Sequence, residues 1–155
     1  MANDRYVDIL LIEDNSGDIR LINDALAETD NKPGISYVRD GVEAILFVRR
    51  QPPFEDAPQP RIIILDLNLP GRDGRDVLKE IKTDPALKLT PVIVFSGSDA
   101  PNDILNCYAT SANCYIVKPR DLNSFTKSIR SLVDFWLKTV RLPPEYNAET
   151  YKTAV

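Results

Sequence analysis

The chain has 155 residues, 43% of them hydrophobic and 27% charged, which suits one globular domain that buries a core without disulfides or structural metal. A net charge of −4 and a pI near 4.9 argue against nucleic acid or an anionic membrane surface as the main partner. We see no signal peptide and no run of the ~20 apolar residues that span a bilayer, so we expect a cytoplasmic protein. The chain has no histidine, which excludes histidine metal sites, histidine-activated nucleophiles and a phosphohistidine of its own.

Short β-branched, apolar runs alternate with longer segments of helical periodicity, a pattern typical of a parallel sheet with helices on both faces. The runs predict five strands, at residues 7–12, 35–39, 62–66, 92–96 and 114–117. We therefore predict an α/β fold with a doubly wound, flavodoxin-like five-stranded parallel sheet. Cys107 and Cys114 have neither CxxC nor zinc-ligand spacing, and we interpret them as two buried thiols.

Helices are predicted between and after the strands. Asp40, with Glu43 three residues later, and Asp73 are expected to cap the second and third helices, and Ser98 or Asp99 the fourth, with Pro101 in its first turn. Apolar residues at helical spacing mark four of these helices. They are Ile19, Ile22, Ala25 and Leu26 in the first; Val77, Leu78 and Ile81 in the third; Ile104, Leu105 and Tyr108 in the fourth; and Leu122, Phe125, Ile129, Leu132, Val133 and Trp136 in the fifth. The second helix is predicted from the capping residues that begin at Asp40. Pro143 and Pro144 are expected to end helical structure, and residues 145–155 to form a weakly ordered tail.

Polar residues close the predicted strands, and in an open parallel sheet such residues converge on one rim. Glu13 and Asp14 follow the first strand, while Asp66, Ser96 and Lys118 close or follow the third, fourth and fifth. Each of them alone could be a helix cap or a solvated side chain. Together, three carboxylates repel one another unless a cation binds or a pKa rises, and hard oxygen ligands suit Mg²⁺. The rim therefore predicts a metal-assisted phosphoryl-transfer site.

Four segments carry a family resemblance: Ile12-Glu13-Asp14-Asn15, the run from Leu65-Asp66-Leu67-Asn68 to Gly74, Val94-Phe95-Ser96-Gly97, and Tyr115-Ile116-Val117-Lys118-Pro119. In this order and spacing they resemble the signature blocks of response-regulator receiver domains. The resemblance implies a receiver domain over residues 5–140 with a short C-terminal extension over 141–155. Within the family, the chain is most similar to single-domain regulators of cyanobacterial phytochrome histidine kinases.

The resemblance also implies a role for each matched residue. Asp66 would accept a phosphoryl group from a phosphohistidine, and Mg²⁺ (or Mn²⁺) would be held by Glu13, Asp14, Asp66 and the backbone carbonyl of Asn68. The phosphoryl oxygens would be bound by Ser96 and Lys118, with Gly97 leaving the approach open. Ser96 and Tyr115 would form the switch, and Lys118-Pro119 would be a cis peptide. Ser96 stands where the family more often has threonine.

The output is expected to be association, because only a short tail follows the fifth predicted helix. The end of the chain holds more apolar residues than one stripe needs: Phe135, Trp136, Leu137, Val140 and Leu142. They either cover a partner subunit or fold back on their own domain. Similar phytochrome-partner regulators form homodimers through this region, so we expect a homodimer, with a histidine kinase of the phytochrome type as the other partner.

Three functions are compatible with these residues to different degrees. The preferred one is a phosphorylatable signalling domain, which is not a metabolic enzyme and at most catalyses its own phosphotransfer and dephosphorylation. The second is a dimeric scaffold of the same fold that works without phosphorylation. The third, a magnesium-dependent phosphatase of the haloacid-dehalogenase type, needs a second aspartate two residues after its nucleophile, where this chain has Asn68.

Overall fold

One parallel sheet forms the centre of the protein in a computed structural model that describes residues 5–144 and 148–154. The strands are β1 (Tyr6–Ile12), β2 (Ile35–Val38), β3 (Gln59–Leu65), β4 (Val92–Ser96) and β5 (Cys114–Val117). Their spatial order is β2-β1-β3-β4-β5, and every neighbouring pair is parallel. The predicted flavodoxin-like sheet is confirmed, with strand limits that differ by up to three residues; β2 and β3 end just before Arg39 and Asp66.

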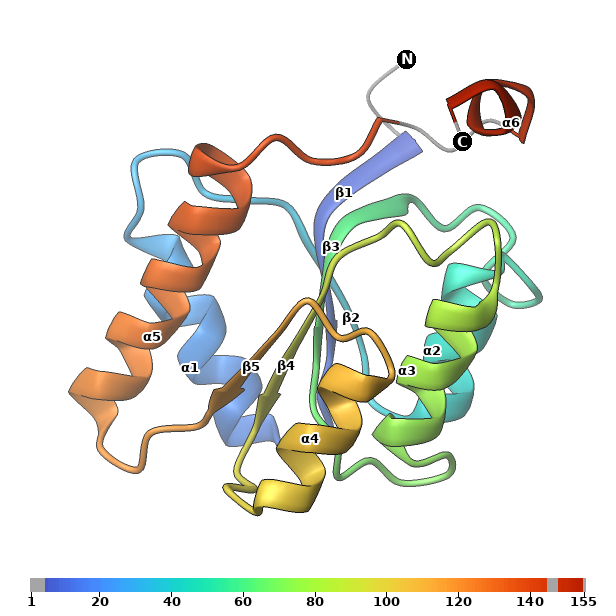
Figure 1. Ribbon diagram of the computed structural model, residues 1–155. Helices are drawn as coiled ribbons and strands as arrows, with labels where there is room; N and C mark the ends of the chain where they lie inside the picture. The colour runs from blue at the N-terminus through green and yellow to red at the C-terminus, as the bar shows by residue number, and fades with distance from the viewer. Residues whose placement is uncertain (1–4, 145–147, 155) are drawn as a thin grey trace.

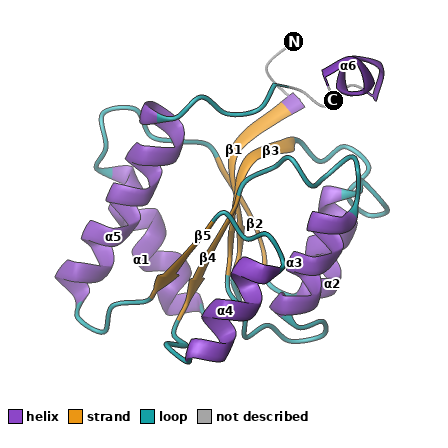
Figure 2. Cartoon of the chain, in the orientation of Figure 1, coloured by secondary structure: helices purple, strands orange, loops and turns teal. Residues whose placement is uncertain are grey.

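Helices cover both faces of this sheet (Figures 1 and 2). On one face lie α1 (Ser16–Ala27) and α5 (Leu122–Asp134), and on the other α2 (Gly41–Val48), α3 (Gly74–Thr83) and α4 (Pro101–Ala109). Along β1, Ile9 and Leu11 pack into the core beneath α1 and α5, whereas Leu10 and Ile12 pack into the core on the opposite face. A strand buried on both sides needs apolar residues at every position, which explains the unbroken apolar runs in the sequence.

Two of the predicted caps are confirmed and one is wrong. Asp40 accepts a hydrogen bond from Glu43 N at 2.7 Å, and Asp73 accepts one from Arg75 N at 2.8 Å. The fourth helix begins after Ala100, with Pro101 in its first turn and no capping side chain. Ser98 is turned toward other partners, as described below.

The apolar stripes of the last two long helices were only partly predicted. In α4 the buried residue is Cys107, whereas Leu105 is 67% exposed and Tyr108 49% exposed. In α5 Phe125, Ile129, Leu132 and Val133 are buried as predicted, but Leu122 at the first position is 59% exposed. The predicted burial of the two thiols holds for Cys107, while Cys114 is half-buried.

Helical structure extends beyond the end of α5. Helical winding continues through the π-helical turn η2 (Phe135–Thr139), closed by a hydrogen bond from Val140 N to Phe135 O at 3.0 Å. Beyond the two prolines, α6 (Ala148–Ala154) is a helix, and the Lys88 ammonium lies 5.4 Å from the centre of the Tyr151 ring. The prediction of a weakly ordered tail was therefore wrong for residues 148–154, and 145–147 and 155 lie outside the described residues. Within the described part of the chain, no helix has the length and apolar character to cross a bilayer.

Candidate functional site

Three carboxylates meet where β1 and β3 end, at the rim that the sequence predicts. Glu13 and Asp14 follow β1, and Asp66 directly follows β3. One carboxylate oxygen of each residue lies within 4.8 Å of the others. Glu13 and Asp66 are buried, with 1% and 6% exposure, and Asp14 is more accessible. The pairing of Ile12 with Leu65 places the ends of the two strands side by side, which brings the three acids together.

The donor set fits a hard divalent cation. Asp66 Oδ1 is buried and has no hydrogen-bond partner, and a buried carboxylate oxygen without a partner is costly. Carboxylate oxygens at this spacing are the ligands that Mg²⁺ and Mn²⁺ take in proteins. Glu13, Asp14 and Asp66 would hold the ion, which would neutralise negative charge at the rim. Asn68 lies on the exposed loop two residues later, and its carbonyl stays a predicted ligand.

The backbone around Asp66 is held by close packing against the start of α3. Leu67 is fully buried, and its carbonyl accepts a hydrogen bond from Gly74 N at 2.9 Å. A Cβ atom on Gly74 would lie only 2.3 Å from Asp66 O and 2.6 Å from Leu67 Cα. Glycine at this position therefore allows the helix to begin directly against the backbone that carries the candidate phospho-acceptor.

Lys118 supplies the positive charge of the site. Its ammonium donates hydrogen bonds to Glu13 Oε2 at 2.6 Å, Asp18 Oδ2 at 2.8 Å and Asp66 Oδ2 at 3.4 Å. The sequence predicted the lysine but not Asp18, which lies in the first turn of α1 rather than at a strand end. The predicted cis peptide at Lys118-Pro119 was wrong: in the described residues the one cis bond is Pro52-Pro53. With the trans bond, which X–Pro pairs favour by about 0.5–1 kcal/mol, the lysine reaches Glu13, Asp18 and Asp66.

The pKa values of the buried pair reflect opposing effects. Burial raises the pKa of Glu13 to about 7; the hydrogen bond and charge of Lys118 lower it, and the charge of Asp66 adds to the rise. Burial alone would lower the pKa of Lys118, but hydrogen bonds to Asp18 and Glu13 and the charges of Glu13 and Asp66 raise it overall. Lys118 therefore stays protonated, and the negative charge of the buried Glu13 is costly without further positive charge.

Ser96 and Gly97 complete the rim beside the acids. Ser96 is fully buried at the end of β4, and its carbonyl accepts a hydrogen bond from Lys118 N at 2.7 Å. Gly97 is exposed, and a Cβ atom added to it would meet no atom within 4 Å. The space beside Gly97 is open, and its role in leaving the approach to Asp66 clear stays a prediction.

Ser98 connects the rim to Tyr115 and to two helices. Its amide donates to Ser96 Oγ at 3.2 Å, and its carbonyl accepts from the half-buried Tyr115 hydroxyl at 2.8 Å. Its own hydroxyl donates to Asp103 Oδ2 at 2.6 Å, and Asp103 Oδ1 accepts from Arg75 at 2.8 and 3.0 Å. The predicted switch residues Ser96 and Tyr115 thus both form hydrogen bonds with Ser98. Through Asp103 and Arg75, Ser98 is also connected to α4 and α3.

The predicted interface residues do not form one exposed patch. Trp136, Leu137 and Leu142 are partly buried against the core beneath α1 and α5, and Val140 is half-buried. Phe135 is 49% exposed and makes an edge-on contact with the Trp136 ring.

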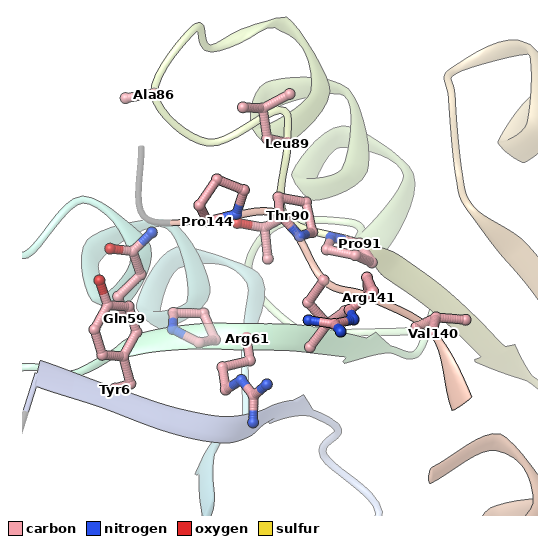
Figure 3. A pocket seen from close by; sticks show the side chains of 13 residues that line it. Tyr6, Gln59, Arg61, Ala86, Leu89, Thr90, Pro91, Val140, Arg141 and Pro144 are labelled. Carbon is pink, nitrogen blue, oxygen red and sulfur yellow. The ribbon is translucent and has the colours of Figure 1, made fainter. Parts of the chain in front are cut away.

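A pocket of about 440 Å³ lies at the opposite end of the sheet from the carboxylates (Figure 3). The starts of β1 and β3 and the segment 140–144 line it, including Tyr6, Arg61, Arg141 and Pro144. It has no part in the chemistry of the acidic rim.

Comparison with known proteins agrees with this geometry. The model of the response regulator receiver domain family matches residues 9–130. Response regulator Rcp1 of Synechocystis sp. is 42% identical over 135 residues, which cover 87% of this chain and 92% of Rcp1.

Two solved structures share the fold with a TM-score of 0.86. The phosphorylated cyanobacterial phytochrome response regulator RcpA is 44% identical, with 90% of this chain and 99% of that chain covered. The Mn²⁺-bound form of Rcp1 is 40% identical, with 89% and 99% covered. The chain therefore belongs to the response regulator receiver domain family and is related to the phytochrome response regulators of cyanobacteria.

Proposed function

We propose that this protein is a two-component response regulator that accepts a phosphoryl group on Asp66 in the presence of Mg²⁺ or Mn²⁺. The observation that carries the proposal is the state of the Asp66 carboxylate. One oxygen is buried without a partner beside Glu13 and Asp14, and the other faces Lys118 at 3.4 Å. Such a carboxylate has a metal site on one side and a cation on the other, which suits attack on a phosphoryl group.

In the proposed transfer, an Asp66 oxygen forms a bond to phosphorus while the bond from phosphorus to the histidine nitrogen of the kinase breaks. The freed imidazole stays on the kinase, and Asp66 becomes an acyl phosphate. Glu13, Asp14 and Asp66 would hold the metal, which would neutralise negative charge at this end of the sheet. Lys118 and the hydroxyl of Ser96 would then donate to the phosphoryl oxygens, which loosens their contacts with Glu13 and Ser98.

The test is a mass measurement after incubation with acetyl phosphate and Mg²⁺. Wild-type protein should gain about 80 Da, the mass of one phosphoryl group. The Asp66→Asn variant should gain no mass. Asp99→Asn, which removes an exposed carboxylate from the nearby loop, is the matched control and should gain the same mass as wild type. An unmodified wild type, or an adduct that survives in Asp66→Asn, would favour the phosphorylation-independent scaffold instead.

We further propose a phytochrome-type histidine kinase as phosphoryl donor and a homodimer as the signalling form. The similarity to Rcp1 and RcpA supports the kinase class. Support for the dimer comes from an apolar groove of about 760 Å³ between β5 and α5, lined by residues that include Ile116, Leu132 and the exposed Phe135. Three of the five residues expected at the interface pack on their own domain, so Phe135 is the one to test.

Analytical ultracentrifugation, with and without beryllium fluoride and Mg²⁺, measures this association. Phe135→Ser should weaken the dimer at least about fivefold, because a half-exposed phenyl ring buried at an interface contributes about 1–3 kcal/mol. Val42→Ser removes an exposed apolar residue of α2, on the other side of the sheet, and should leave association unchanged. Protein that is monomeric at all concentrations would contradict the dimer while leaving phosphorylation intact.

A further inference from the structure

The acidic side chains around Lys118 are not equivalent. Glu13 and Asp66 belong to the candidate metal cluster, whereas Asp18 does not. Asp18 nevertheless makes a hydrogen bond of 2.8 Å to the ammonium, shorter than the 3.4 Å contact to Asp66. The lysine is therefore held more closely by an acid outside the metal cluster than by the candidate phospho-acceptor.

The position of Asp18 is fixed by the start of α1. Its amide donates to Asn15 Oδ1 at 2.9 Å, which caps the helix, and Asn15 N in turn donates to Glu13 Oε1 at 3.1 Å. The Asp18 side chain is 24% exposed and that of Lys118 12% exposed, so water screens the pair only partly. The ion pair is thus a built feature of the rim.

A bound phosphoryl group changes the balance between these partners. The group brings roughly −1.5 to −2 charges, and in the proposed function Glu13 would be a ligand of the metal. Lys118 is then shared between the phosphoryl oxygens and Asp18. Asp18 competes with the phosphoryl oxygens for the Lys118 ammonium, and its negative charge repels the phosphoryl group. The same negative charge attracts a cation that binds the neighbouring acids.

We propose that Asp18 is a positioning residue that competes with the phosphoryl group for Lys118, and so sets how tightly the activated site holds its anion. This inference rests on the proposed function. It assigns to Asp18 two effects of opposite sign, tighter binding of the metal and weaker binding of the phosphoryl group. A residue that merely supports the local fold would affect both in the same direction.

Isothermal titration calorimetry of Asp18→Asn, which keeps the shape and removes the charge, tests the inference. Mg²⁺ should bind about threefold to tenfold more weakly, and beryllium fluoride at saturating Mg²⁺ about threefold to tenfold more tightly, as expected for one partly screened charge nearby. Asp24→Asn removes an exposed acid from the same helix, paired with Arg20 at 3.9 Å, and should change neither affinity.

Asp18→Glu keeps the charge within reach of the lysine and should restore affinities close to those of wild type. Asp18→Ser, a second uncharged variant with a residue tolerated in a first helical turn, gives the same test if Asp18→Asn folds poorly. If both affinities fall together, or neither changes, the inference is overturned while the proposed function stands. A wild type that binds no beryllium fluoride would overturn both.

Discussion

Replacing Gly74 with alanine should both destabilise the protein and weaken its metal site. The added Cβ atom would lie 2.3 Å from Asp66 O, 2.6 Å from Leu67 Cα and 2.9 Å from Leu67 O, all of them backbone atoms that cannot rotate away. Ordinary contact begins near 3.4 Å, so α3 and the loop must separate by about 1.1 Å. That shift also strains the hydrogen bond from Gly74 N to Leu67 O.

The expected cost follows from these contacts. Overpacking against fixed atoms costs about 1–3 kcal/mol and a weakened hydrogen bond about 1 kcal/mol, while the better helix propensity of alanine returns at most about 1 kcal/mol. The free energy of unfolding should therefore fall by about 1–3 kcal/mol, which lowers the urea midpoint by roughly 0.5–2 M. The Mg²⁺ affinity should fall as well, because the displaced backbone carries Asp66.

Urea unfolding at 25 °C and calorimetric titration with Mg²⁺ measure the two effects. Gly34→Ala is the matched control: its added Cβ would have its nearest neighbours at 3.7 Å, an ordinary contact, and should change stability by less than about 0.5 kcal/mol. If Gly74→Ala were as stable as Gly34→Ala and bound Mg²⁺ like wild type, the backbone of Asp66 would not depend on this close approach.

Other consequences can be measured in the same way. Asp66→Asn should raise the metal-free free energy of unfolding by roughly 1 kcal/mol, because it removes a buried charge that faces Glu13, and Mg²⁺ should no longer raise its melting temperature. Lys82 donates to Lys88 O, Thr90 O and Asn113 Oδ1 at 2.9–3.1 Å, so Lys82→Met should destabilise by about 1–3 kcal/mol in urea unfolding, and a loss below 0.3 kcal/mol would mean that these bonds contribute little. Burial lowers the pKa of Lys82 to about 8, below the usual value of 10.5; the unfolded chain therefore binds more protons between these values, and the stability of wild type relative to Lys82→Met should rise from pH 8 to 10. A constant difference between the two urea midpoints over that range would contradict the lowered pKa.

Much of the fold could be predicted because a strand buried on both faces leaves a clear mark in the sequence. Ile62 to Leu65 and Val92 to Phe95 are apolar at every position for this reason. The stripe of α4 was harder to predict, since Leu105 and Tyr108 follow helical spacing without being buried. Apolar periodicity indicates which side chains of a helix could be buried. Which of them are buried depends on the elements that pack against the helix.

The candidate site was predictable to the extent that its residues follow strands. Glu13, Asp14, Asp66, Ser96 and Lys118 all lie at the carboxyl ends of strands, where topology alone brings them together. Asp18 was missed because its role depends on where a lysine one hundred residues later extends its side chain. The spacing between Asn15 and Asp18, a cap followed by an acid in the first turn, could have drawn attention to it but reads equally well as ordinary helix capping.

In the proposed function, the hydrogen bond of 2.7 Å from Lys118 N to Ser96 O would affect how an activating signal spreads. It joins the backbones of the two residues that would bind phosphoryl oxygens, so the hydroxyl and the ammonium are mounted on adjacent strands whose separation is a constant of sheet geometry. The spacing of the two strands would therefore limit which anions can contact both groups at once. Because β5 is an edge strand, any displacement of Ser96 that moves Lys118 with it would be passed directly to an edge of the sheet.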